Sequence, residues 1–112
     1  MELSGILLIG CAQGCLGLRE KAKHNACFQA TTLEEALLIL QEHPDILVVV
    51  VDCRSNSVER LTDTARVLRQ EGFLNWMIAV CTRGDTKRQM VKTEYDLSCS
   101  EDEVCDIVSS LV

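Results

Sequence analysis

The sequence predicts an α/β domain built on a doubly wound, parallel five-stranded sheet, with the order strand–helix repeated five times. Short, continuous apolar runs are typical of strands that are covered on both faces. Segments with helical spacing separate these runs, so successive strands are expected to be joined by right-handed helical crossovers. Because 112 residues leave room for one hydrophobic core, we expect a single domain over residues 1–112, whether whole or excised from a longer signalling protein.

The strands are expected where the apolar runs lie. The most strongly marked is Asp45–Asp52, whose six consecutive aliphatic residues, most of them β-branched, are typical of a central strand. The first strand is expected at Gly5–Gly10 and the fourth at Trp76–Cys81, both short and apolar. The second is expected at 26–30 and the fifth at 95–97.

The helices are expected from capping residues and from apolar spacing. The second helix begins at a capping box, Thr32–Glu35, and ends at His43–Pro44. The third runs from a cap at Ser57 to a stop at Gly72, and the last begins at a second capping box, Ser100–Glu103. Their apolar faces are Leu33, Ala36, Leu37 and Leu40; Val58, Leu61, Ala65 and Leu68; and Val104, Ile107, Val108 and Leu111. The first and fourth helices are expected around 18–23 and 86–91.

Composition narrows the classes of partner. The net charge is -6 and the pI is about 4.8, which argues against nucleic acid or an anionic membrane surface as a partner. No apolar run is long enough to cross a bilayer, and no signal peptide is expected. Seven cysteines, most of them within or beside apolar runs, favour a reducing, cytoplasmic location. The charged residues of the third helix, among them Asp63, Arg66 and Arg69, are expected to form a solvated face.

Ligands of doubly wound sheets gather beyond the carboxyl ends of the strands. The first strand is followed by Gly10, Cys11, Ala12 and Gln13, and the third by Asp52, Cys53 and Arg54. The fourth leads into Cys81, Thr82 and Arg83, and the fifth is expected to lead into Ser98 and Cys99. Candidate site residues are therefore sought at this edge of the sheet.

Two segments and one single residue give a resemblance to the receiver domains of response regulators. Pro44–Asp52 resembles the family's third strand, and this resemblance makes Asp52 the candidate phosphoacceptor. Thr82 matches the hydroxyl residue that ends the fourth strand, and Thr32–Leu37 matches the opening of the second helix. The resemblance implies a receiver or flavodoxin-like fold with the strand order 2-1-3-4-5. It also makes Thr82, Cys11, Cys53 and Arg54 candidate rim or switch residues.

The chain departs from the receiver pattern at two positions. Receivers place an acidic pair after the first strand to hold Mg²⁺, but Gly10 and Cys11 stand there and supply no carboxylate. Receivers also place a lysine at the end of the fifth strand, and the Ser98–Cys99 region has none. Because phosphoryl transfer depends on the metal and a cation in position, these departures predict a pseudo-receiver. We expect a regulatory or interaction module in intracellular signalling that is not an enzyme and holds no metal or cofactor.

Within this family, the chain is most similar to the receiver-like N-terminal segment of the animal high-affinity cAMP phosphodiesterases of the type 8 class. The similarity lies in Ala30–Leu37 and Asp52–Ser55. It implies that the catalytic domain lies elsewhere on a longer chain.

Several alternatives remain open. Asp52 could still accept a phosphoryl group, or it could be a solvated aspartate that caps the next turn. The loop from Gly10 to Gly14 resembles the phosphocysteine loop of sugar phosphotransferase IIB components, with Cys11 as the carrier. The edge could also bind a small ligand. Cys11, Cys53, Cys81 and Cys99 could hold zinc, although no C-x₂-C pair supports it. The expected partner is a protein or a second copy of the chain, bound through Val104, Ile107 and Leu111.

Overall fold

The computed structural model describes residues 5–10, 27–52, 58–80, 95–99 and 101–111. The helices expected around 18–23 and 86–91, and the caps at Ser57 and Ser100, lie outside these residues.

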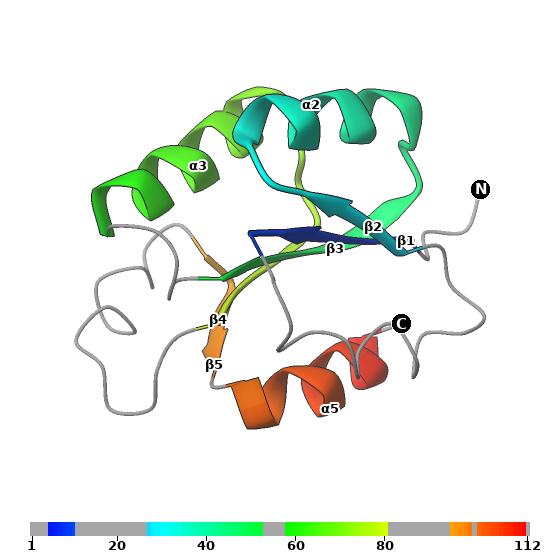
Figure 1. The fold of residues 1–112 in the computed structure, drawn as a ribbon. Coiled ribbons are helices and arrows are strands. Elements are labelled where there is room, and N and C mark those ends of the chain that lie inside the picture. Colours follow the sequence, from blue (N-terminus) through cyan, green and yellow to red (C-terminus); the bar gives the residue numbers. More distant parts are fainter. Residues whose placement is uncertain (1–4, 11–26, 53–57, 81–94, 100, 112) are drawn as a thin grey trace.

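Five parallel strands form one sheet in the order β2-β1-β3-β4-β5, as the sequence predicts (Figure 1). The strands are β1 (Gly5–Ile9), β2 (Cys27–Ala30), β3 (Ile46–Asp52), β4 (Trp76–Val80) and β5 (Leu97–Cys99). The first four agree with the expected strands to within one residue at each end.

The fifth strand begins two residues later than the 95–97 expected from the sequence. The reason is the way in which Asp96 meets β4. Its backbone N–H donates to the carbonyl oxygen of Met77 at 2.9 Å, but its side-chain Oδ2 accepts from the Met77 N–H at 2.8 Å. The Met77 N–H therefore donates to a side-chain oxygen, where in a regular sheet it would donate to a backbone carbonyl of the neighbouring strand. Regular pairing starts only at Leu97.

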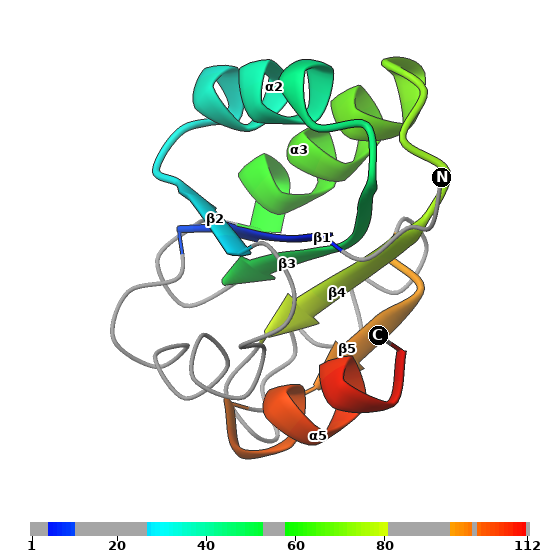
Figure 2. The same ribbon diagram turned by 90° about the vertical axis from the view of Figure 1, so that its right-hand side faces the viewer.

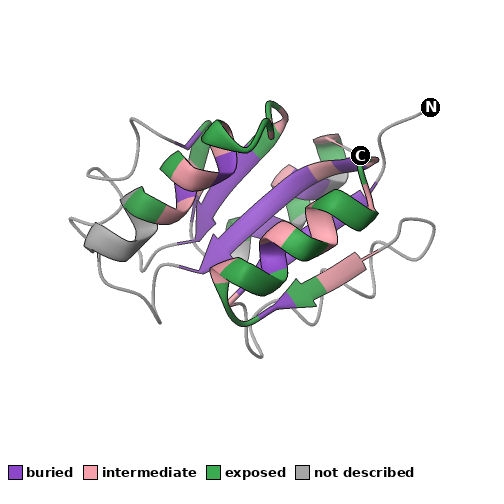
Figure 3. Cartoon of the chain, turned by 90° about the horizontal axis from the view of Figure 1, so that it is seen from above, coloured by how far each residue is buried: buried purple, intermediate pink, exposed green. Residues whose placement is uncertain are grey.

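Helices cover both faces of the sheet. The two helices α2 (Leu33–Glu42) and α3 (Val58–Gln70) lie on one face, and α5 (Glu101–Leu111) lies on the other (Figures 1 and 2). The buried residues concentrate in the strands, while the helices carry exposed residues on their outward sides (Figure 3). Within the described residues, no helix has the length and apolar character needed to span a membrane.

Two apolar clusters fill the spaces between the sheet and the helices. The first, on the side of α2 and α3, includes Leu7, Ile9, Ala36, Val49, Val51, Ala65, Leu68 and Met77. The second, on the side of α5, includes Ile6, Leu8, Val48, Val50, Ile78, Val80, Cys99, Val104 and Val108. Side chains of successive strand residues point to opposite faces, so an unbroken aliphatic run such as that of β3 contributes to both clusters.

This alternation is interrupted once, near the start of β3. Gly5 pairs with Ile46, but Ile6 pairs with Val48, so β3 holds one extra residue at Leu47. Leu47 and Val48 consequently pack with the same cluster. A Cβ atom on Gly5 would lie 3.1 Å from Ile46 Cγ1 and 3.2 Å from Ile46 Cα, so a side chain at position 5 would require Ile46 to shift by a few tenths of an ångström.

The start of α2 has one half of the predicted capping box, and α3 ends at the predicted glycine. The Thr32 side chain accepts a hydrogen bond from the Glu35 N–H at 3.2 Å, while the Glu35 carboxylate reaches back to the N–H and hydroxyl of Thr31 rather than to Thr32. Gly72 ends α3 with φ of 98°. The Gly72 N–H donates to Arg69 O, and the next N–H donates to Leu68 O, which is the hydrogen-bond pattern of a Schellman motif.

Candidate functional site

Asp52 is the last residue of β3 and lies at the carboxyl edge of the sheet, as expected. Its side chain is only 3% exposed, and it is the one charged residue that is buried among those the structure describes. Of the alternatives left open for Asp52, the burial contradicts the solvated aspartate. Asp52 follows Val48 and Val50 in the alternation of β3 and continues the face that α5 covers, with Val80 as its partner on β4. A carboxylate at this position is largely removed from bulk water.

Gly10 lies beside Asp52 at the end of the adjacent strand. Ile9 pairs with Val51, so the next residue of each strand comes to the same level of the sheet. Gly10 has φ of 66° and its N–H donates to Ala30 O at 2.9 Å. This is the place of the first member of the acidic pair in receivers, and the glycine offers no side-chain oxygen for a divalent ion.

The fifth strand offers no cation at the same edge. Cys99 is the last residue of β5, is fully buried and pairs with Val80, the residue that also pairs with Asp52. Ser98 and Cys99 therefore lie within β5, not beyond it as expected, because the strand starts later. The later start of β5 does not supply the missing lysine, because the sequence contains no Lys or Arg after Lys92.

Four other candidates, Cys11, Cys53, Arg54 and Thr82, lie outside the described residues, as does Cys81. Of the proposed zinc-binding cysteines, Cys99 alone is described, and it packs among the apolar side chains of the α5 face. The phosphocysteine, zinc and small-ligand alternatives therefore stay predictions.

The residues expected to mediate self-association belong in part to the core. Val104 is fully buried, whereas Ile107 and Leu111 are partly buried and pack at the margin of the same cluster. A partner that binds α5 could therefore contact Ile107 and Leu111, but not Val104.

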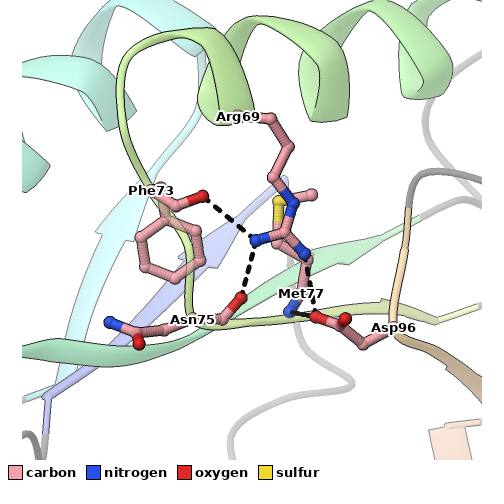
Figure 4. A network of polar contacts seen from close by, with 5 residues as sticks. All are labelled: Arg69, Phe73, Asn75, Met77 and Asp96. Atoms are coloured by element: carbon pink, nitrogen blue, oxygen red, sulfur yellow. Dashed lines mark hydrogen bonds and ion pairs between the residues drawn. The ribbon is translucent and has the colours of Figure 1, made fainter.

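A polar network that the sequence analysis missed lies at the opposite edge of the sheet, near the amino end of β4 (Figure 4). The Arg69 guanidinium donates to the carbonyl oxygens of Phe73 at 3.0 Å and Asn75 at 2.9 Å, and it forms an ion pair with Asp96 at 2.9 Å. The prediction that Arg69 lies on a solvated face is wrong. Arg66, on the same helix, is exposed, and among the described residues its ion-pair partner is Asp63, at 3.5 Å. The one sequence signal for this role was an arginine in the last turn of a helix, where side chains can bind terminal carbonyls.

Comparison with known proteins identifies the fold. No family model matches the sequence. No curated protein matches it. Among solved structures, the chain is similar to a response-regulator receiver domain from Bermanella marisrubri, with 20% identity, a TM-score of 0.74 and 96% of each chain covered. It is also similar to the receiver domain of a putative Luxo repressor protein from Vibrio parahaemolyticus, with 13% identity, a TM-score of 0.69 and coverage of 98% of this chain and 89% of the other.

The same fold also occurs outside response regulators. The lysine decarboxylase LdcF from Francisella novicida matches all of this chain over 17% of its own, with 13% identity and a TM-score of 0.64. The chain therefore has the receiver fold, as the sequence predicted. Because a fold hosts many functions, its function has to be argued from the site.

Proposed function

We propose that this chain is a receiver-like regulatory module that acts by binding a partner protein and is not switched by phosphorylation of Asp52. The observation that carries the proposal is the glycine beside Asp52 at the end of β1. A receiver needs a carboxylate there to hold Mg²⁺ against the phosphoryl group.

Electrostatics support the proposal. Negative charge develops on the phosphoryl oxygens during transfer, and catalysis depends on positive charge placed there beforehand. Gly10 stands in the metal-binding position, so the end of β1 supplies no carboxylate there for Mg²⁺. No Lys or Arg follows residue 92, so β5 supplies no cation. Burial of Asp52 to 3% exposure adds a second obstacle, because the nucleophilic oxygen must be reached by the phosphoryl donor.

The resemblance to type 8 cAMP phosphodiesterases gives this module a setting. The resemblance rests on Ala30–Leu37 and Asp52–Ser55, and from it we propose that the module belongs to a longer cytoplasmic chain whose catalytic domain lies elsewhere. In that setting the chain itself is no enzyme and conveys a regulatory state through its partner. The sequence that adjoins these residues in the natural gene tests this point, and a phosphodiesterase catalytic domain there is the expected result.

Phosphorylation is tested by incubating the protein with acetyl phosphate and Mg²⁺ and measuring its intact mass under non-acidic, cold conditions. The proposal predicts no gain of a phosphoryl group, and the Asp52→Asn variant should behave identically. A mass gain in the original protein that Asp52→Asn abolishes would refute the proposal. A gain abolished only by Cys11→Ser would replace it with the phosphocysteine alternative.

A further inference from the structure

A groove of about 350 Å³ lies at the end of the sheet opposite Asp52. It is bounded by the carboxyl ends of α2 and α3 and by the connections that descend from them to β3 and β4 (Figure 2). Ile46 at the start of β3 lies in its wall, and Asp52 is six residues further along the same strand, about 20 Å away at 3.3 Å per residue. An inference about this groove therefore goes beyond the proposed function and does not depend on the chemistry of Asp52.

Of the twelve described residues that line the groove, seven are apolar, and the others are polar or charged side chains and a glycine. Its apolar side chains are Leu37, Leu40, Pro44, Ile46, Leu68, Phe73 and Leu74. Leu74 is 80% exposed, the highest value among the exposed large apolar residues of the described chain. Water contact with an isolated leucine is common, but a leucine at the mouth of an apolar groove adds to a continuous surface that a partner can cover. The rim residues Gln41, Glu71 and Gly72 are exposed too, so the groove is open and suits inserted side chains better than an enclosed small molecule.

Among the described residues, the charged side chains that line the groove or adjoin it in the chain are acidic. Glu71 lines it, Glu42 and Asp45 adjoin lining residues, and no Lys or Arg is among the described lining residues. The nearest arginine in the chain, Arg69, is held by Asp96 and by two carbonyl oxygens. Both bordering helices also end here, and α2 has no basic residue in its last turn, so its partial negative charge is not offset by a side chain of its own.

We propose that this groove binds a protein segment that inserts an apolar side chain between the ends of α2 and α3 and places lysine or arginine against the acidic rim. The apolar residues of the lining favour an apolar inserted side chain, and the acidic residues of the rim favour positively charged residues on either side of it. A second copy of this chain is a poorer occupant, because its net charge of -6 would bring like charges together.

The proposal is tested with a peptide library in which a central leucine is fixed and the flanking positions are randomised. Selection against the original protein should enrich Lys and Arg at the flanks. The strongest selected peptide, labelled with fluorescein, is then titrated with Glu71→Lys and with Glu34→Lys as the matched control. Glu34 is also an exposed glutamate; it lies in the first turn of α2 and is not among the residues that line the groove. Binding should weaken at least fivefold in Glu71→Lys and less than twofold in Glu34→Lys.

The position of the bound peptide is mapped by amide chemical shifts, which should move most at Gln41, Gly72, Leu74 and Asn75. Leu74→Ala should weaken binding at least threefold, and its high exposure means that the fold is retained. Enrichment of acidic flanks, no selected peptide, equal effects of the two charge reversals, or shifts centred on β5 and α5 would each overturn the proposal. So would sedimentation data in which a dimer of this chain buries the groove. None of these outcomes affects the result expected in the phosphorylation experiment, so either proposal can be refuted while the other stands.

Discussion

Replacing Arg69 tests whether the polar network of Figure 4 holds α3 against the sheet. Arg69→Met keeps an unbranched side chain but removes three hydrogen bonds, to Phe73 O, Asn75 O and the Asp96 carboxylate. A hydrogen bond to a charged group contributes about 1.5–3 kcal/mol when it is well shielded. The Arg69 and Asp96 side chains are 26% and 36% exposed, and the released carbonyls can regain water, so these values must be discounted. We expect a loss of about 2 kcal/mol in the free energy of unfolding.

The pairwise part of this effect is measured by a double-mutant cycle with Asp96→Asn. Asparagine can still accept from the Met77 N–H, so the variant mainly removes the charge that Arg69 meets. The expected coupling free energy is about 1 kcal/mol, the upper end for partly exposed ion pairs. Arg66→Met is the matched control on the same helix. Its arginine is 56% exposed and meets one carboxylate at 3.5 Å, so the variant should lose less than about 0.5 kcal/mol.

Urea denaturation followed by far-ultraviolet circular dichroism, and by the fluorescence of Trp76, the only tryptophan, supplies these free energies. Equal effects of Arg69→Met and Arg66→Met, or a coupling free energy below about 0.3 kcal/mol, would show that the network does not stabilise the packing of α3 against the sheet.

Three further substitutions test the helix ends and the core by the same denaturation assay. Gly72→Ala should destabilise by about 1 kcal/mol through its positive φ alone, because a Cβ there would meet no atom within 4 Å, and an equal or larger loss in Gly72→Asn would contradict this reason. Leu68→Ala should cost about 2–5 kcal/mol because the side chain is fully buried between α3 and the sheet, and a loss below about 1 kcal/mol would show that the site is loosely packed. Thr32→Ala should cost about 1 kcal/mol by removing the acceptor of the Glu35 N–H, whereas an unchanged stability would mean that the cap contributes nothing.

The sequence predicted those parts of the fold that depend on neighbouring residues. The aliphatic run of β3 and the apolar spacing of α2 are local patterns, and the parallel order of the sheet follows from the way the elements alternate. The boundary of β5 was missed because a side chain of Asp96 replaces a backbone acceptor, and a pattern of apolar residues does not carry that information.

The sequence predicted where Asp52 lies in the sheet, but it did not predict how far Asp52 is buried. Asp52 lies where the run of β3 indicated, yet its burial depends on which strands and helices come to lie around it, and the end of one strand does not reveal this. Arg69 was misread for a related reason. Its partners Asp96 and Asn75 lie 27 and 6 residues away in the chain, so its role emerges only when α3, β4 and the approach to β5 are brought together.

The central claim is that the acidic end of β3 lacks the companions needed to hold a divalent ion. Paramagnetic Mn²⁺, titrated into ¹⁵N-labelled protein as a stand-in for Mg²⁺, reports this directly by broadening the amide signals of residues near a bound ion. The account predicts no selective broadening of Gly10, Val51 or Asp52. The Gly10→Asp variant adds a carboxylate beside Asp52, in a backbone conformation that aspartate tolerates. This variant should show selective broadening of the same amide signals, because the added carboxylate helps to hold the ion. Selective, saturable broadening of Gly10 and Asp52 in the original protein would contradict the account.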